Sequence, residues 1–123
     1  MFLVFAMAKG DIIYLDEAVE AWNMDGSSDA QADSGSWLRD VENATGEQRG
    51  SCSFEGCLNR ANVGGHVWIK RRGVFIAPIC RRCNDARNKT RMQGAGARLR
   101  ANIKVMKTLM TDGMRNAPRR NPW

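Results

Sequence analysis

The sequence predicts an α+β protein in which a small metal-stabilised domain is flanked by an N-terminal helical part and a C-terminal helix. Three observations lead to this class. Four cysteines form two close pairs, β-rich runs lie between the pairs, and apolar residues recur at helical spacing on either side. With 123 residues and 26% charged side chains, the chain suits one domain, or one small domain with an appended piece.

Helical patterns are expected in both flanking parts. Residues 11–23 carry apolar side chains mostly three or four positions apart, which predicts a helix. Residues 26–35 are rich in Gly, Ser and Asp and predict a loop, after which Ser36 is the expected N-cap of a short helix over residues 37–43. Residues 97–111 predict a basic amphipathic helix. Its apolar stripe consists of Leu99, Ile103, Met106 and Met110.

The middle of the chain predicts a β-hairpin followed by a helix. Residues 66–70 and 74–77 are β-rich, and a tight turn at residues 71–73 separates them, where Gly73 is free to take a positive φ. A polar helix is expected to follow over residues 81–92.

The two cysteine pairs have the spacing of a tetrahedral metal site. Four residues separate the first pair, two separate the second, and 22 lie between the pairs. Each pair can present two thiolates from one turn, and the hairpin brings the pairs together. We therefore expect one structural Zn²⁺ bound by Cys52, Cys57, Cys80 and Cys83. Two disulfides, four free thiols, or His66 in place of one cysteine remain open as alternatives.

Residues 52–89 resemble the zinc-stabilised branch of the HNH-type endonuclease family, and the order of knuckle, hairpin and helix resembles a treble clef. The resemblance rests on the first cysteine pair, on the run Gly65-His66-Val67, and on the run from Ile79 to Asn84 with Lys89 beyond. It implies His66 as general base, with Asn84 or Asn88 as a ligand of Mg²⁺ or Mn²⁺.

The chain departs from this family's pattern at the catalytic positions. Gly65 stands where the family has Asp or His, residues 74–76 are apolar where the family has its central Asn, and His66 is the chain's single histidine. Asp85 is the only carboxylate near this region, although hard divalent cations prefer carboxylates. We therefore expect no catalysis, and a structural role for His66 is the alternative to that of a base.

Charge is unevenly distributed. Residues 1–48 hold two basic and ten acidic side chains, a net charge of −8, whereas residues 49–123 hold seventeen basic and three acidic ones, a net charge of +14. The split points to a polyanionic partner for the basic part, unless the acidic part folds onto it. The expected nucleic-acid-binding residues are Trp68, Arg81, Arg82, Arg87, Lys89, Arg91, Arg98 and Arg100. A solvated helix face, with Trp68 packed over the knuckle, is the alternative.

These patterns divide the chain into four parts. We expect an acidic, mainly helical part over residues 1–48, a treble-clef zinc domain over residues 49–93, a basic amphipathic helix over residues 94–114, and a flexible basic tail over residues 115–123. No apolar run approaches the roughly 20 residues that span a bilayer, so no membrane partner is expected. Without an export signal, the expected location is the reducing cytoplasm.

The leading expectation is a non-catalytic zinc module that binds nucleic acid or a nucleoprotein complex. An HNH-type, metal-dependent DNA endonuclease using His66 is the first alternative. The second is a protein-binding adaptor or inhibitor, of the kind a phage or mobile element encodes, acting through the acidic part. A protein partner or a second copy of the chain would bind that part or the apolar stripe over residues 99–110.

Overall fold

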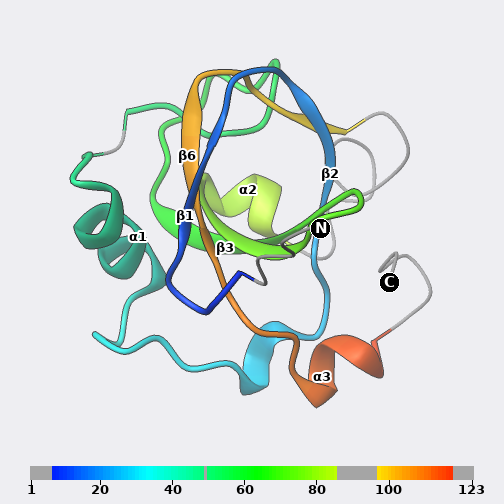
Figure 1. The fold of residues 1–123 in the computed structure, drawn as a ribbon. Helices are drawn as coiled ribbons and strands as arrows, with labels where there is room; N and C mark the ends of the chain where they lie inside the picture. The colour runs from blue at the N-terminus through cyan, green and yellow to red at the C-terminus, as the bar shows by residue number, and fades with distance from the viewer. Residues whose placement is uncertain (1–6, 49, 86–96, 118–123) are drawn as a thin grey trace, which may run out of the picture.

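A curled antiparallel sheet of six strands dominates the structure, a computed structural model that describes residues 7–48, 50–85 and 97–117 (Figure 1). The strand order is β1-β6-β4-β3-β2-β5. The elements are β1 (Ile12–Leu15), β2 (Val19–Asn23), the 3₁₀ turn η1 (Ser27–Asp29), α1 (Trp37–Thr45), β3 (Val63–Ile69), β4 (Gly73–Ile79), α2 (Arg81–Asn84), β5 (Arg98–Leu99), β6 (Ile103–Lys107) and α3 (Asp112–Arg115). The α+β class is confirmed, with less helix than the sequence predicts.

The predicted hairpin is confirmed by β3 and β4, which pair along their whole length. The backbone N–H of Arg72 donates to the carbonyl oxygen of Ile69 at 2.9 Å and closes the turn. Gly73 has a φ of 100° and Arg71 a φ of 67°. Because a positive φ costs glycine little and costs other residues roughly 1–2 kcal/mol, Gly73 suits this turn, whereas Arg71 is an unfavourable residue for it.

The helix predicted over residues 11–23 is wrong, because these residues form β1 and β2. Leu15 and Ala21 are buried in the main core, and Ile13 and Val19 pack against it. Within each strand these side chains are two positions apart, so strand alternation brings them into the core. The N-terminal part is therefore not mainly helical.

The helix predicted over residues 97–111 is also wrong, since the chain forms β5 and β6 there and α3 begins only afterwards. The expected apolar stripe disperses over three separate clusters. Leu99 is buried in the main core and Ile103 packs against it. Met106 belongs to the cluster beneath α1, and Met110 packs against a cluster near α3. The stripe is thus not one helical surface for a partner.

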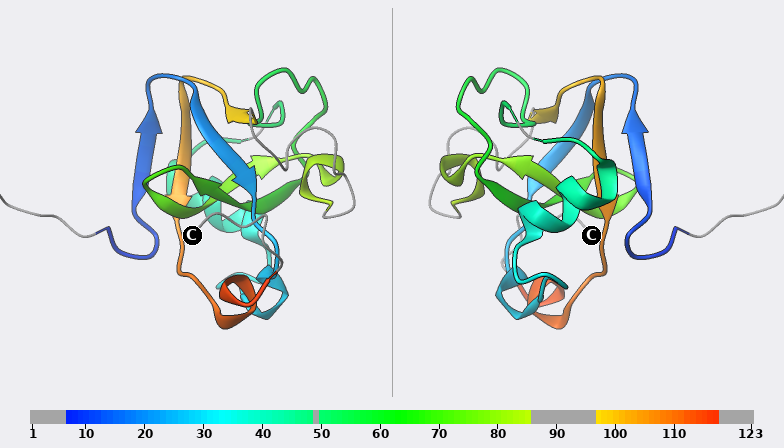
Figure 2. Two further views of the ribbon diagram at one scale, coloured as in Figure 1. Left: turned by 90° about the vertical axis from the view of Figure 1, so that its right-hand side faces the viewer. Right: turned by 90° about the vertical axis from the view of Figure 1, so that its left-hand side faces the viewer.

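The short helix after Ser36 is confirmed by α1. Its N-terminus is capped as predicted, since Ser36 Oγ accepts a hydrogen bond from the backbone N–H of Arg39 at 3.2 Å. The helix covers the outer face of the sheet, where Val41 packs with Ile76 and Met106 (Figure 2). Gly64 allows this close approach, because a Cβ there would lie 2.5 Å from the backbone nitrogen of Leu38.

The predicted polar helix over residues 81–92 and the tail over residues 115–123 are described only in part. α2 forms only the first turn of that helix and ends at Asn84, since Asp85 has an extended backbone with a ψ of 119°, so the prediction of one continuous helix is wrong; residues 86–96 lie outside the described residues. Arg115 ends α3, and residues 118–123 also lie outside the described part. None of the helices that the structure describes is long and apolar enough to cross a membrane.

Strands from three of the four predicted parts share the one sheet, and within the described residues two ion pairs join the acidic part to the basic part. Lys70 Nζ lies 2.8 Å from Glu20 Oε2, and Lys104 Nζ lies 3.2 Å from Glu47 Oε1. These side chains are partly exposed, so each pair stabilises the fold weakly. The pairs nevertheless show that the acidic part contacts the basic part, in line with the alternative that the acidic part folds onto it.

Candidate metal centre and its surroundings

The first cysteine pair lies on a tight loop formed by residues 50–61. The backbone N–H of Cys52 donates to the carbonyl oxygen of Asn59 at 2.8 Å, and the N–H of Cys57 donates to the carbonyl oxygen of Phe54 at 3.2 Å. Gly56 has a φ of 83°, which lets the chain reverse between the two cysteines. The loop therefore brings the two sulfur atoms close together, as a metal knuckle requires.

The second pair lies where β4 ends and α2 begins. Cys80 is the N-cap of α2, and its Sγ accepts a hydrogen bond from the backbone N–H of Cys83 at 3.4 Å. Asn62 Oδ1 accepts a hydrogen bond from the N–H of Arg81 at 2.9 Å, which satisfies a further free group of the first turn. The helical turn places Cys83 on the same side as Cys80.

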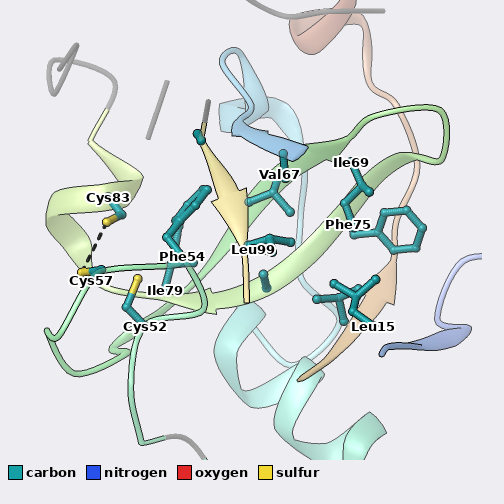
Figure 3. Packing of buried hydrophobic residues seen from close by; sticks show 14 of the residues in the cluster. Leu15, Cys52, Phe54, Cys57, Val67, Ile69, Phe75, Ile79, Cys83 and Leu99 are labelled. Carbon is teal, nitrogen blue, oxygen red and sulfur yellow. Dashed lines mark hydrogen bonds between the residues drawn. The ribbon is translucent and has the colours of Figure 1, made fainter. Parts of the chain in front are cut away.

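The cysteine loop is fixed to the sheet by contacts on two sides. The backbone N–H of Ser53 donates to the carbonyl oxygen of Pro78 at 2.9 Å, and Ser53 Oγ donates to the same oxygen at 2.6 Å. On the other side, the N–H of Glu55 donates to the carbonyl oxygen of Arg98 on β5 at 2.8 Å. Phe54 is fully buried between these contacts and joins the main core (Figure 3).

The four sulfur atoms have the separations of a tetrahedral thiolate site. They all lie within 4.8 Å of one another, and all four cysteines are buried. Cys57 Sγ lies 3.8 Å from Cys80 Sγ and 3.8 Å from Cys83 Sγ, and Figure 3 shows Cys52 beside Cys57 and Cys83. In a tetrahedral site with metal–sulfur bonds of about 2.3 Å, the sulfur–sulfur edge is also about 3.8 Å. The four predicted ligands are therefore brought together and could hold a metal ion.

Disulfides and a histidine ligand do not fit this arrangement. All four cysteines are free, and the 3.8 Å separations are far longer than a disulfide bond of about 2.0 Å. His66 is not among the residues that gather around the sulfur atoms. Of the alternatives that the sequence left open, free thiols without a metal are the one compatible with these distances.

The electrostatics of the thiols favour a bound cation. Burial, together with repulsion from the neighbouring sulfur atoms of Cys80 and Cys57, raises the pKa of Cys52 to about 11. Burial, together with repulsion from Cys52, also raises the pKa of Cys83. Burial would raise the pKa of Cys80 too, but hydrogen bonds from the backbone of Cys83 and from Asn59 outweigh it and lower this pKa to about 7. Four thiolates this close would need a cation to neutralise their repulsion.

His66 is buried beneath α1. It is 3% exposed, and its ring meets the Trp37 ring edge-on with the centroids 4.8 Å apart. Its Nε2 has no hydrogen-bond partner among the described residues. Burial lowers the pKa of His66 to about 4, despite the nearby Asp29 carboxylate, which acts in the opposite direction. A general base needs contact with its substrate and a pKa closer to neutrality, so this environment suits a structural histidine.

The predicted catalytic residues His66 and Asn84 have different immediate surroundings. A Cβ on Gly65 would lie 2.8 Å from Asn84 Oδ1, so Asn84 faces the same side of β3 as Gly65. Because successive residues of a strand point to opposite faces, His66 faces the other side. Asn88 lies outside the described residues.

The predicted nucleic-acid-binding residues occupy different surroundings. Arg81 and Arg82 are exposed on α2, next to the cysteine loop. Arg98 lies 4.0 Å from Glu55 and donates a hydrogen bond to the carbonyl oxygen of Ala18, while Arg100 donates one to the carbonyl oxygen of Ser51. These last two therefore support the fold. The three that lie outside the described residues are Arg87, Lys89 and Arg91.

Trp68 is not packed over the knuckle, as one sequence-based alternative had it. It is half-buried on β3 and packs against the cluster of Met24, Val74 and Met114. Asn59, which the sequence did not single out, donates a hydrogen bond from its Nδ2 to Cys80 Sγ at 3.6 Å. An amide side chain two positions after Cys57 was the available signal.

Comparison with known proteins adds no assignment. Neither the protein-family models, nor the curated proteins, nor the solved structures give a match to this chain.

Proposed function

We propose that the chain is a structural zinc module that binds nucleic acid without cleaving it. The gathering of four buried sulfur atoms at tetrahedral spacing carries the metal part of this proposal. Thiolate ligands and tetrahedral geometry are what Zn²⁺ favours, and four protein ligands leave no open position for substrate. The zinc therefore holds the cysteine loop against β4 and α2.

The order of cysteine loop, hairpin and short helix supports the treble-clef arrangement and the likeness to the zinc-stabilised HNH branch. In this proposal the likeness extends to the scaffold and not to the reaction. Two features support that distinction. His66 is buried under Trp37, and Asn84 faces the other side of β3. A catalytic His66 would have to be exposed by a movement of α1.

The charge of the chain supports a polyanionic partner. Residues 49–123 hold seventeen basic and three acidic side chains, and within the described residues Lys70 and Lys104 form ion pairs with the acidic part. Around the metal centre Arg60, Arg81 and Arg82 are exposed. Exposed cations of this kind bind phosphates and provide affinity with little sequence preference.

A separate adaptor role for the acidic part fits the fold less well. β1 and β2 contribute two strands to the shared sheet, and Leu15 and Ala21 belong to its main core. A deletion of residues 1–48 would therefore disrupt the sheet itself. Single charge reversals at exposed acidic positions are a better test of that alternative.

The test of the proposed function combines metal analysis with binding at several salt concentrations. We expect one zinc ion per chain, and binding of labelled DNA or RNA oligonucleotides by the zinc-loaded protein at low salt. For duplex DNA, the logarithm of the affinity should fall by about 0.9 per contacted phosphate for each tenfold rise in salt. Magnesium or manganese should leave plasmid DNA uncut. Zinc-loaded protein that binds neither single-stranded nor duplex nucleic acid at low salt would refute the proposal.

A further inference from the structure

An open cleft lies at the end of the β3–β4 hairpin that is remote from the cysteines. Its volume is about 690 Å³, within the usual range for sites that hold small ligands. The apolar side chains that line it are Trp68, Val74, Leu109 and Met110. Leu109 is 57% exposed and Trp68 is half-buried, so an aromatic side chain and a leucine meet solvent together here.

The charged residues that line the cleft are cationic. They are Lys107 and Arg115, and no carboxylate is among the described lining residues. Among the residues that the structure describes, no carboxylate lies within ion-pair distance of Lys107. Its Nζ lies over the Phe75 ring at 4.8 Å and donates to the carbonyl oxygen of Arg72 at 3.5 Å. Burial lowers the pKa of Lys107, which is consistent with a cation held without a counter-charge. Arg115 is exposed and paired with the exposed Asp112 at 3.5 Å.

The turn of the hairpin extends this positive charge. Lys70, Arg71 and Arg72 are consecutive and exposed. In the part of the chain that the structure describes, Lys70 is the one of the three within ion-pair distance of a carboxylate, that of Glu20, which also lies beside Arg71. In the left view of Figure 2 this turn and α2 lie at opposite ends of the hairpin. Arg71 occupies the third position of the turn with a φ of 67°, where glycine or asparagine is the favoured residue. The chain thus carries a cationic side chain at a position where glycine or asparagine would adopt the positive φ at a lower cost in free energy.

We infer that this cleft and the adjoining turn bind single-stranded nucleic acid, with one base against Trp68 and its phosphates near Lys107 and Arg71. The inference rests on the proposed nucleic-acid binding and assigns it to a surface and a form of the nucleic acid. A base offers a flat apolar face to Trp68 and Leu109, and its linked phosphates match the cations at the rim. Paired bases in a duplex keep their faces stacked on each other, so an unpaired strand fits better.

The test uses zinc-loaded protein and a fluorescein-labelled oligothymidylate, with a duplex of equal length for comparison. Fluorescence anisotropy should show tighter binding of the single strand. Trp68→Leu should weaken this binding by about 5- to 150-fold, the range expected for loss of one base–aromatic stack. Leu109→Glu adds a carboxylate to the cleft and should weaken binding at least about tenfold.

Two further variants separate binding from folding. Leu58→Glu makes the same chemical change on the cysteine loop, where Leu58 is 95% exposed, and should leave the affinity within about twofold. Arg71→Gly relieves the unfavourable φ, so its thermal midpoint should be unchanged or higher while binding weakens. If Arg71 contacts a phosphate, the salt slope for the single strand should also fall by about 0.7.

The outcomes distinguish the inference from the proposed function on which it depends. Binding that Leu109→Glu and Arg71→Gly leave unchanged, but that Arg81→Ala with Arg82→Ala abolishes, would overturn the inference and keep the proposed function. Equal or tighter binding of the duplex would overturn the assignment to single strands. No binding of either oligonucleotide would remove both proposals.

Discussion

Removal of the metal should release the cysteine end of the molecule. A structural zinc site contributes an apparent 10–16 kcal/mol of binding free energy, whereas a domain of this size has a total stability of about 5–15 kcal/mol. Without the binding free energy of the metal, the cysteine loop cannot stay folded. The loop over residues 50–61 is attached through Ser53–Pro78 and Glu55–Arg98 hydrogen bonds, so we expect chelation to release the loop and β5 together.

Hydrogen exchange measured by mass spectrometry, with and without a zinc chelator, would follow this change segment by segment. Protection should disappear at residues 50–61, 80–84 and 98–100 before it disappears in β4 and β6. Replacement of zinc by Co²⁺ offers a second measurement, because thiolate-to-cobalt charge-transfer absorption depends on the number of sulfur ligands. Cys80→Ser should reduce this absorption, and the control His66→Gln should leave it unchanged. A chelated protein with full protection at residues 50–61 would refute the reasoning.

Three further predictions concern stability. Because folding lowers the pKa of His66 from 6.5 to about 4, the unfolded chain binds a proton at this residue before the folded chain does as the pH falls. The contribution of His66 to stability is therefore fully present above about pH 6.5 and falls by about 3 kcal/mol as the pH drops to 4. The difference in urea midpoint between the wild type and His66→Gln, measured at each pH, would separate this effect from acid release of the metal. Gly64→Ala should destabilise the fold by about 1–3 kcal/mol, because the new Cβ would meet the backbone of α1. The control Gly50→Ala should cost less than about 1 kcal/mol, because a Cβ at Gly50 would have no atom within 4 Å. Similar urea midpoints for the two variants would contradict this packing. Ser36→Ala should cost about 1 kcal/mol through loss of the cap of α1, and an unchanged thermal midpoint would argue against that hydrogen bond.

Local signals were enough to predict the elements whose structure depends on neighbouring residues. Ser36 precedes an apolar and charged run and caps α1 as its residue type predicts. Gly73 lies between two β-rich runs and takes the positive φ that the turn needs. The four cysteines were predictable as one site because their spacing follows from ligand geometry and not from the rest of the fold.

The strands β1 and β6 were mistaken for parts of helices because apolar side chains occur on both of their faces. In β1, Ile13 packs against the main core, while Ile12 packs against the cluster beneath α1. In β6, Val105 and Met106 are divided between the same two clusters. An apolar residue at successive positions hides the alternation expected of a strand. The alternation becomes recognisable only when α1 is known to cover one face of the sheet.

The strands β1 and β2 show how a turn completes the false helical pattern. Leu15 ends β1 and Val19 begins β2, four positions later, so the two look like neighbours on a helix face. In the structure they lie on separate strands that reach opposite parts of the sheet, β1 beside β6 and β2 beside β3 (Figure 1). The four-position spacing between Leu15 and Val19 therefore comes from the turn that connects β1 to β2, and not from a helix. The strands β3 and β6 begin at least 48 positions after Leu15 in the chain. Pairing with these distant strands determines that residues 12–23 form strands, so the local sequence pattern does not predict it.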